Sequence, residues 1–271
     1  MPGLVAALAD QWQVRLEAPF AEIKMNYVAP GVTADGTPCV LKVSRYIGET
    51  RTEIAALRLW DGVGVPRLLE ADPERGALLM ERAVPGTMLV SLDHDDDTAT
   101  LVAAEMLRQL WRPLPERHEL RSLASWCAAY ERNRAALTAG ADGFPRQLFE
   151  RGDALRAELL ATPTEPTVLH GDLHHFNILR SDRAGWLAVD PKGLAGDRAF
   201  DVCQFLRNPT VMPLAIIRRR LDILCAELGL DRQRVNKWCV VHAVLDASWD
   251  FEDRNPEMHG RVAYAESLLE L

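Results

Sequence analysis

The chain has 271 residues, of which 48% are hydrophobic and 26% are charged, and this composition is typical of a globular protein with one large or two small domains. Its formal net charge of −8 argues against nucleic acid as the main partner, because nucleic-acid-binding surfaces are basic. An acidic protein suits a cationic ligand, although the same charge also simply aids solubility.

The cysteines are scattered along the chain without a Cys-x-x-Cys pair, which indicates reduced thiols rather than a disulfide framework or a zinc site. They are Cys39, Cys127, Cys203, Cys225 and Cys239. The first ten residues show no basic segment, and no apolar run reaches the roughly 18 residues of a membrane span. We therefore expect a cytoplasmic protein with no membrane partner, and nothing in the sequence indicates an obligate protein partner.

The start of the chain predicts one short helix followed by strands. Residues 4–12 form a short amphipathic helix, residues 23–28 alternate as a strand, and residues 38–43 form a second strand after a turn at residues 34–37. Lys42 lies at the end of that second strand. A lysine there either faces solvent at a sheet edge or, as in kinases, grips the phosphates of a nucleotide.

A helix and a hairpin follow. Residues 49–60 carry an apolar stripe at helical spacing, and Glu53 lies near the edge of that stripe. Residues 65–71 and 77–83 predict a hairpin whose second strand breaks just before Pro85. A strand that ends in a Pro-Gly pair fits a hinge, whose exposed backbone N–H and C=O groups can bind a base.

Most of the remaining chain is predicted to be helical. An acidic cluster at residues 93–97 favours the start of a helix, because carboxylates stabilise the positive end of the helix dipole. Apolar residues recur at helical spacing in six further segments, at residues 99–111, 123–137, 149–160, 211–228, 231–250 and 259–271.

Polar side chains interrupt an apolar stretch in the middle of the chain. His170 and Asp172 follow one short strand-like run, Asn177 precedes another, and a turn at residues 181–185 leads to an apolar strand that delivers Asp190. Burying a carboxylate without a partner is costly. Two aspartates and an asparagine at the ends of apolar strands therefore indicate a functional site.

The chemistry that these residues fit is phosphoryl transfer. Asp172-x-x-x-x-Asn177 has the spacing of the kinase catalytic loop, and Asp190 stands where a kinase holds its metal-binding aspartate. We therefore expect Asp172 to accept the proton of the acceptor hydroxyl. Asn177 and Asp190 are expected to bind Mg²⁺, which prefers oxygen ligands, while Lys42 neutralises charge on the phosphates.

The loop His-Gly-Asp-Leu-His-x-x-Asn at residues 170–177 resembles that of the aminoglycoside phosphotransferase family. The segment Asp-Pro-Lys-Gly-Leu-x-Gly-Asp at residues 190–197 is similar to the branch of streptomycin 6-kinases and hydroxyurea phosphotransferases. The resemblance implies an α+β, two-lobed protein-kinase-like fold. A small N-terminal lobe with an antiparallel sheet would span residues 1–83, and a mainly helical C-terminal lobe would span residues 84–271.

The resemblance also implies an activity. The chain would be an ATP-dependent O-phosphotransferase that uses Mg²⁺ and moves the γ-phosphoryl group to a hydroxyl of a small molecule, with an aminoglycoside such as streptomycin, or hydroxyurea, as the favoured acceptor. Two alternatives stay open: the same chemistry on a metabolite such as choline, homoserine or a sugar, and a catalytically silent kinase-like nucleotide-binding protein. The silent protein is disfavoured by the joint presence of Lys42, Asp172, Asn177 and Asp190.

Several further roles follow from the resemblance alone. Glu53 is implied as the carboxylate that pairs with the phosphate-binding lysine, with Glu49 as the competing choice. Glu81 and Ala83 are implied to bind adenine through backbone atoms. The Gly-x-Gly-x-x-Gly loop of protein kinases is missing from the sequence, so the turn at residues 18–22 is expected to cover the phosphates instead.

The residues around the central motif are expected to support it. His170 is expected to bond the loop backbone, and His174 is a candidate phosphate contact. Lys192 either contacts phosphate or faces solvent. Asp197 either supports the active-site loop or is a surface helix cap, and Asp201 is implied to brace the catalytic loop through its backbone.

One group near the end of the chain is a candidate acceptor site. Asp246, Trp249 and Asp250 lie on the helix predicted for residues 231–250. They either bind a cationic sugar, through charge and through stacking on the indole, or form an ordinary helix end.

Overall fold

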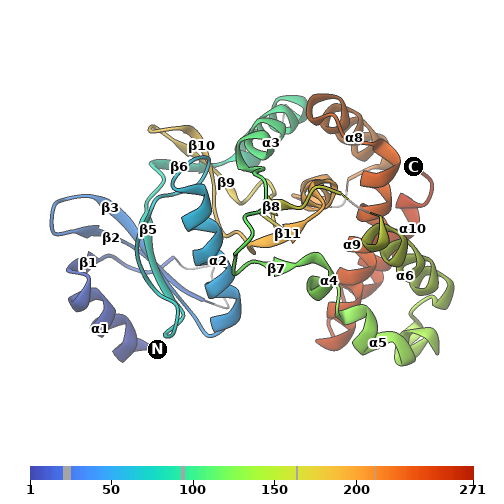
Figure 1. Ribbon diagram of the computed structural model, residues 1–271, viewed down its shortest axis with the longest axis horizontal. Helices are drawn as coiled ribbons and strands as arrows, with labels where there is room; N and C mark the ends of the chain where they lie inside the picture. Colours follow the sequence, from blue (N-terminus) through green and yellow to red (C-terminus); the bar gives the residue numbers. More distant parts are fainter. Residues whose placement is uncertain (21–25, 93–94, 163, 211) are drawn as a thin grey trace.

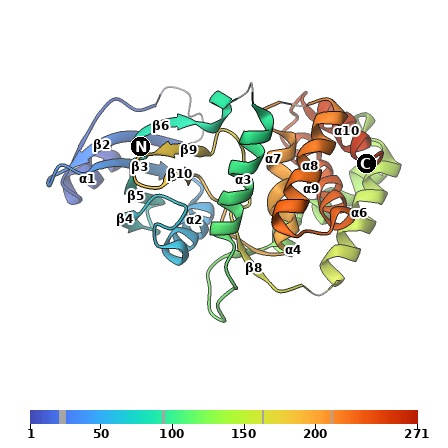
Figure 2. The same cartoon turned by 90° about the horizontal axis from the view of Figure 1, so that it is seen from above.

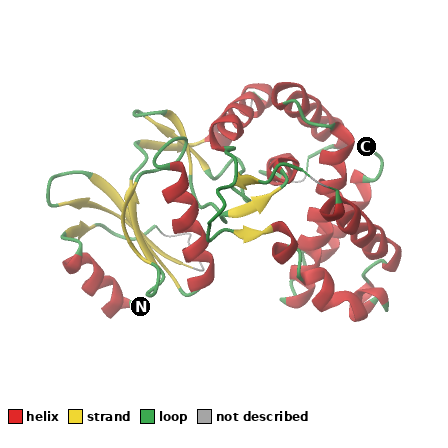
Figure 3. Ribbon diagram, viewed as in Figure 1, coloured by secondary structure: helices red, strands yellow, loops and turns green. Residues whose placement is uncertain are grey.

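The computed structural model describes residues 1–20, 26–92, 95–162, 164–210 and 212–271. A strand-rich part begins the chain and a helix-rich part ends it, with short strands between them (Figures 1 and 3). The architecture is α+β, as predicted, while the division at residue 83 remains a prediction. Within the described ranges, no helix is both long and apolar enough to cross a lipid bilayer.

Five antiparallel strands form the N-terminal sheet, in the order β1-β2-β3-β5-β4. Its strands and the two helices beside it are α1 (Pro2–Gln11), β1 (Val14–Leu16), β2 (Asn26–Thr33), β3 (Pro38–Ser44), α2 (Ile47–Trp60), β4 (Leu68–Asp72) and β5 (Ala77–Glu81). Both hairpins predicted here, β2–β3 and β4–β5, are present. Residues 21–25 lie outside the described residues, and with them the start of the strand predicted at residues 23–28 and the end of the turn predicted at residues 18–22.

Alternation along β3 decides which of its side chains face the rest of the molecule. Cys39, Leu41 and Val43 are fully buried on one face, where they pack against α1. The residues between them point to the opposite face, because successive side chains of a strand alternate. That face is the one covered by α2 (Figure 1), so Lys42 points into the molecule and is only 7% exposed.

Helix α2 joins the N-terminal sheet to the helical part. Its buried residues Ile54, Leu57 and Trp60 belong to the same apolar cluster as the C-terminal helices, and Trp60 Nε1 donates a hydrogen bond to the Leu110 carbonyl at 2.7 Å. The stripe predicted at residues 49–60 is thus the packing face of α2. The packing of α2 therefore holds the N-terminal sheet, with β3, against the helical part of the chain.

The helical part is built around α9 (Arg232–Glu252), which is buried on nearly all sides, as expected of a helix in the middle of a bundle. Helices α5, α6 and α10 pack against it, and Figure 2 shows α6 and α10 beside it. The other elements after β5 are β6 (Pro85–Met88), η1 (Leu89–Leu92), α3 (Asp96–Leu110), β7 (Arg121–Ser122), α4 (Leu123–Trp126), α5 (Ala129–Thr138), η2 (Ala141–Gly143), α6 (Arg146–Ala161), β8 (Thr167–Leu169), β9 (Ile178–Ser181), β10 (Gly185–Ala188), β11 (Leu194–Gly196), η3 (Arg198–Val202), α7 (Cys203–Arg207), α8 (Leu214–Leu228) and α10 (Met258–Leu268).

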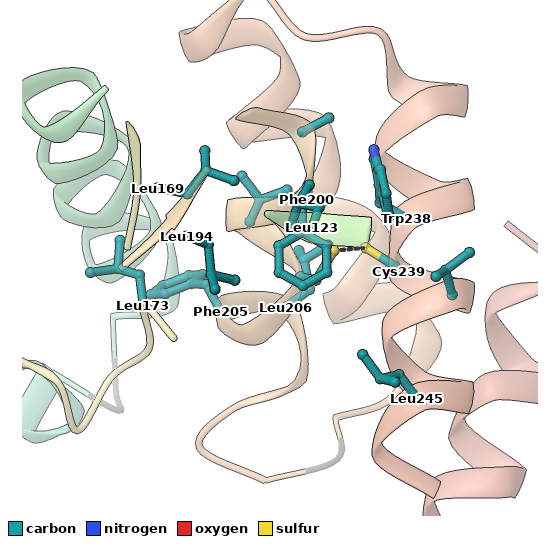
Figure 4. Close-up of a cluster of buried hydrophobic side chains, with 14 of the residues drawn as sticks. Leu123, Leu169, Leu173, Leu194, Phe200, Phe205, Leu206, Trp238, Cys239 and Leu245 are labelled. Atoms are coloured by element: carbon teal, nitrogen blue, oxygen red, sulfur yellow. Dashed lines mark hydrogen bonds between the residues drawn. The ribbon is translucent and has the colours of Figure 1, made fainter. Parts of the chain in front are cut away.

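Two further sheets, β10-β9-β6 and β7-β11-β8, lie between the N-terminal sheet and the helices (Figure 1). The second is anchored in the main core, where Leu169 of β8 and Leu194 of β11 lie near Phe200 and Phe205 (Figure 4). Cysteine sulfur atoms also lie in this core, and all five cysteines are free. The β7-β11-β8 sheet is therefore a well-packed base for the loops that leave it.

One predicted helix is divided in the structure, and another begins where it was predicted. Residues 123–137 form two helices, α4 and α5, because the chain turns at Cys127. The buried residues Leu123, Cys127 and Tyr130 keep helical spacing across the break, so the apolar pattern does not reveal it. Asp95 accepts a hydrogen bond from Thr98 N at 3.1 Å and starts α3 as predicted; residues 93 and 94 lie outside the described residues.

Candidate active site

The hairpin of β9 and β10 brings the two expected metal ligands to one end. Ile178 lies opposite Ala188, and the Val189 N–H donates to the Asn177 carbonyl at 2.8 Å. Asn177 and Asp190 therefore flank the same end of the hairpin, although they are distant in the chain. Asp190 has a φ of +58°, a left-handed conformation that aspartate tolerates better than most residues do.

Asp201 holds the loop between β8 and β9. Its carboxylate accepts the N–H groups of His170 at 2.9 Å and Gly171 at 2.6 Å, and Trp111 Nε1–H at 3.1 Å. Burial raises the pKa of Asp201 to about 6, even though these donors favour its ionised form. Gly171 has a φ of +80°, and a Cβ there would lie 2.8 Å from the Leu194 side chain, so the loop needs glycine at this turn.

His170 ties the same loop to the hairpin as a neutral ring. The Asp172 N–H donates to His170 Nδ1 at 3.2 Å, so Nε2 carries the ring proton and donates it to the Val189 carbonyl at 3.0 Å. Burial lowers the pKa of His170 to about 3, and the ring is stacked on Trp60. These contacts are those expected of a structural histidine.

Lys42 and Glu53 form a buried ion pair next to Asp190. Lys42 Nζ lies 2.9 and 2.7 Å from the two Glu53 carboxylate oxygens and also contacts Asp190. Burial acts to lower the pKa of Lys42, but the carboxylates of Glu53 and Asp190 outweigh it and leave the pKa raised. Burial raises the pKa of Glu53, an effect that Lys42 opposes. Glu49 is exposed, so the glutamate beside Lys42 is Glu53.

Lys192 bridges the two aspartates of the motif. Its Nζ lies 3.1 Å from Asp190 Oδ2 and 3.3 Å from Asp172 Oδ2, and its side chain is 22% exposed. Burial acts to lower the pKa of Lys192, but Asp172 and Asp190 more than compensate and raise it. Of the two sequence-based expectations for this residue, the solvent-facing one is therefore wrong.

Asp172 faces these cations from the loop. Its side chain is 16% exposed, and His174 Nε2 lies 3.7 Å from its Oδ1. The Asn177 Nδ2–H donates to its backbone carbonyl at 3.0 Å. Burial lowers the pKa of His174, so this ring is neutral near pH 7 and is not a charged partner of Asp172.

The oxygen atoms at the end of the hairpin suit a hard divalent cation. Because its amide nitrogen is engaged, Asn177 presents Oδ1, for which the described residues offer no donor. The Asp190 side chain is 39% exposed. Two protein oxygens leave the other positions to phosphate and water, the usual arrangement for Mg²⁺. No group of three His, Cys, Asp or Glu side chains in the described ranges is placed to hold a metal by itself.

The two predicted adenine-binding positions differ in their backbone groups. Glu81 donates its N–H to the Arg67 carbonyl at 2.9 Å, and its side chain pairs with Arg183 at 2.7 Å. Ala83, which follows β5, has no hydrogen-bond partner for its N–H or C=O among the residues described. Ala83 is therefore the position whose backbone is free to bind a base.

Asp246, the first carboxylate of the candidate acceptor site, already forms ion pairs within the protein. Asp246 is 5% exposed, and its Oδ2 lies 2.5 Å from Arg207, 3.4 Å from Arg261 and 3.4 Å from His242 Nδ1. Burial acts to raise its pKa, but His242 and Arg207 outweigh this effect and lower it. The negative charge of Asp246 is therefore already neutralised by side chains of the protein itself.

The other two members of this group are also engaged. Asp250 pairs with Arg261 and accepts a hydrogen bond from Asn255 at 2.9 Å, and it lines a hollow of about 440 Å³ at the ends of α9 and α10. Trp249 packs edge-on against Trp126, with ring centroids 5.2 Å apart. Within the described ranges, no contact joins Asp246, Trp249 or Asp250 to Asp172, so their role in acceptor binding stays a prediction.

Asp197 is a buried cap rather than a surface cap. It is 7% exposed and accepts a hydrogen bond from Ala199 N at 3.0 Å at the start of η3. Its other oxygen accepts from Arg234 Nε and Trp238 Nε1, both at 2.5 Å. Asp197 therefore ties the segment that carries Asp201 to α9.

One contact at the site was not predicted from the sequence. Thr52 Oγ1 on α2 donates to the Lys192 carbonyl at 2.8 Å. Gly193 has a φ of +61°, and a Cβ there would lie 2.1 Å from the Thr52 carbonyl oxygen. Helix α2, which carries Glu53, thus touches the loop that carries Asp190. The glycine is the only signal in the sequence, since nothing distinguishes Thr52 from a surface threonine.

Comparisons with known proteins show what the chain is similar to. The chain matches a family model described as aminoglycoside/hydroxyurea antibiotic resistance kinase over residues 11–254. It is 37% identical over 260 residues to the streptomycin 6-kinase of Streptomyces glaucescens, a match that covers 93% of this chain and 84% of that protein. It is also 37% identical over 280 residues to the hydroxyurea phosphotransferase of Kitasatospora aureofaciens, covering 99% and 79%.

A solved structure confirms the fold. The chain is similar to a choline/ethanolamine kinase family protein from Mesorhizobium loti, with a TM-score of 0.74 and 17% sequence identity over 100% of this chain and 95% of that one. At this identity the similarity concerns the fold alone. The predicted kinase-like fold is therefore correct.

Proposed function

The chain belongs to the aminoglycoside/hydroxyurea antibiotic resistance kinase family, and from this premise we propose that it is an ATP-dependent O-phosphotransferase that inactivates a small hydroxyl-bearing compound. The proposed acceptor is a streptomycin-like aminoglycoside or hydroxyurea, because the two relatives above are named for these compounds. ATP is the proposed phosphoryl donor, and Mg²⁺ the proposed metal.

Asp172 acts as the general base. As it accepts the proton of the acceptor hydroxyl, the acceptor oxygen forms a bond to the γ-phosphorus, the bond from that phosphorus to its bridging oxygen breaks, and ADP leaves with the electron pair. The backbone of Asp172 is fixed on both sides, because its N–H donates to the His170 ring and its carbonyl accepts from Asn177. Such positioning matters because phosphoryl transfer depends mainly on placement and electrostatics.

Lys42, Asn177 and Asp190 hold the donor phosphates. Lys42 neutralises phosphate charge. Glu53 orients it, because both carboxylate oxygens of Glu53 accept hydrogen bonds from the Lys42 ammonium. Asn177 Oδ1 and the Asp190 carboxylate are the metal ligands. When bound, Mg²⁺ supplies further charge neutralisation and orients the phosphates.

The contact between Lys42 and Asp190 is the main support for this function. It joins β3 of the N-terminal sheet to the end of a hairpin in the second half of the chain. A buried ion pair is weak evidence for stability, since desolvation offsets much of its attraction. Its place beside Asp172 and Asn177 instead fits a site that binds a nucleotide with its metal.

An ADP-release assay tests the function directly. The purified protein is supplied with ATP, Mg²⁺ and one acceptor at a time, from streptomycin, other aminoglycosides, hydroxyurea, choline, homoserine and simple sugars, and Asp172→Asn serves as the blank. We expect acceptor-dependent ADP release with streptomycin-like compounds or hydroxyurea. Turnover only with choline, homoserine or a sugar would assign a metabolite kinase, and tight ATP binding without turnover on any acceptor would favour a silent nucleotide-binding protein.

A further inference from the structure

We propose that Lys192 is the residue that binds the transferred phosphoryl group: its ammonium, shared between Asp172 and Asp190 in the free protein, contacts the γ-phosphoryl oxygens of the bound nucleotide. Lys192 takes this role only if the chain is the phosphotransferase proposed above. The role differs from that of Lys42, which reaches the site from the N-terminal sheet and is held by Glu53.

The backbone of Lys192 is fixed from two sides. Its N–H donates to the His170 carbonyl at 2.8 Å, so it follows the loop that carries Asp172. Its carbonyl accepts the Thr52 Oγ1–H at 2.8 Å, and the next residue, Gly193, lies directly against the backbone of α2. The side chain therefore starts from a defined point, and its ammonium reaches the space between the two aspartates.

The place of the ammonium matches the place of the reacting phosphorus. Asp172 is proposed to touch the attacking hydroxyl, and Asp190 is proposed to hold the metal on the donor phosphates. During transfer the γ-phosphorus lies between the attacking and leaving oxygens, hence between the regions served by these two carboxylates. Lys192 Nζ lies 3.3 Å from one and 3.1 Å from the other, which puts a positive charge beside that position.

Lys42 and Lys192 differ in how many of their N–H donors are already engaged, which distinguishes their roles. An ammonium has three N–H donors. Those of Lys42 meet both oxygens of Glu53 and one of Asp190. Lys192 Nζ donates a hydrogen bond to Asp190 and forms an ion pair with Asp172, and no further partner for its Nζ is present among the residues that the structure describes. With its side chain 22% exposed, Lys192 has a donor available for an incoming oxygen.

Once a divalent cation is bound, the local charge balance calls for an anionic ligand. Glu53, Asp172 and Asp190 face the two ammonium groups, and both lysines contact Asp190. A divalent cation at Asp190 would meet two positive neighbours, unless phosphate oxygens arrive with it and draw the ammonium groups to themselves. Lys192 can turn toward the terminal phosphate. Apart from Asp190, its carboxylate partner is Asp172, the proposed base, whereas Lys42 is also held by Glu53.

Binding of two nucleotides distinguishes this role from a purely structural one. By calorimetry with Mg²⁺ present, Lys192→Met should weaken binding of a non-hydrolysable ATP analogue about tenfold or more, the value of one charge-assisted hydrogen bond. ADP, which lacks the γ-phosphoryl group, should bind within about twofold of wild type. Lys192→Arg keeps the charge and should recover most of the loss. No acceptor is needed, so the result does not depend on knowing the substrate.

Lys237→Met is the matched control, because Lys237 lies on the surface of α9 and pairs with Glu158, away from the reacting groups. It should leave both affinities unchanged. An equal loss for ADP and the ATP analogue in Lys192→Met, or no loss for either, would overturn the assignment. Lys192→Gln provides the same comparison if the methionine variant does not fold, and a wild-type protein that binds neither nucleotide would instead refute the phosphotransferase function.

Discussion

Replacing Gly193 with alanine should disable the site without altering any reacting group. A Cβ at Gly193 would lie 2.1 Å from the Thr52 carbonyl oxygen, whereas real Cβ contacts essentially never fall below 3.0 Å. Helix α2 and the loop of Asp190 must then separate by roughly 0.9 Å, and a displacement near 1 Å can cost about 100-fold in rate. We expect kcat/KM to fall about 100-fold, equivalent to about 2.7 kcal/mol of transition-state stabilisation.

Gly229 provides a matched control for the backbone effect. It follows α8, has the same φ of +61°, and has nothing within 4 Å of the position of a Cβ. Gly229→Ala should therefore lower the free energy of unfolding by about 1 kcal/mol through backbone strain alone and leave kcat/KM unchanged. Urea unfolding and ADP release, measured on both variants, separate strain from the displacement of α2.

The outcome that refutes this reasoning is specific. If Gly193→Ala loses no more stability than Gly229→Ala and keeps wild-type kcat/KM, the contact between α2 and the loop does not hold the geometry of Lys42, Glu53 and Asp190. A loss of stability without a loss of kcat/KM would likewise show that the contact serves folding only.

Other variants test single roles. Asp172→Asn should bind nucleotide within about twofold of wild type while turnover in the ADP-release assay falls about 10²–10⁴-fold, the usual contribution of a general base; near-wild-type turnover would exclude the base role. Asp190→Asn retains a residue that tolerates the left-handed backbone and should weaken Mg²⁺-dependent binding of an ATP analogue about tenfold or more in calorimetry, because a metal ligand loses its charge; unchanged affinity would rule out the metal-ligand role. Asp201 predicts a pH dependence: because burial raises its pKa from 3.8 to about 6, the folded protein keeps a proton that the unfolded chain releases. Its contribution to the free energy of unfolding is thus complete below about pH 4 and is lost as pH rises to about 6. Asp201→Asn, which does not titrate, should remove this slope from urea unfolding between pH 4 and 7, and equal slopes in the two proteins would contradict the shift.

The central site could be predicted because its signals are local. Asp172 and Asn177 stand at a fixed spacing in one loop, and Asp190 follows the next strand, so the motif and the hairpin are visible in a short stretch of sequence. The alternation of β3 similarly places Lys42 on the face opposite Leu41, although alternation alone does not say what covers that face. The resemblance implied Glu53 as the partner of Lys42, and the structure places Glu53 on α2 beside it.

The remaining features depend on partners that are distant in the chain. Nothing near Asp246 in the sequence indicates that Arg207 and Arg261 lie on it, so its charge looked available to a ligand. The contact of Thr52 with the Lys192 carbonyl leaves no local pattern, because it depends on how α2 sits on a loop that comes much later. The lobe boundary at residue 83 and the cytoplasmic location remain predictions.

The apolar cluster that runs from α2 into the helical part also bears on how the molecule opens. Separating the two parts would return Trp60 and its neighbours to water, at about 25 cal/mol per Å² of apolar surface, and would break the hydrogen bond from Trp60 to the Leu110 carbonyl. The two parts should therefore melt as one cooperative unit. Helix α1 packs its buried residues Val5 and Leu8 on the small separate cluster of the outer sheet face, so it is the element whose amide protons we expect to exchange first.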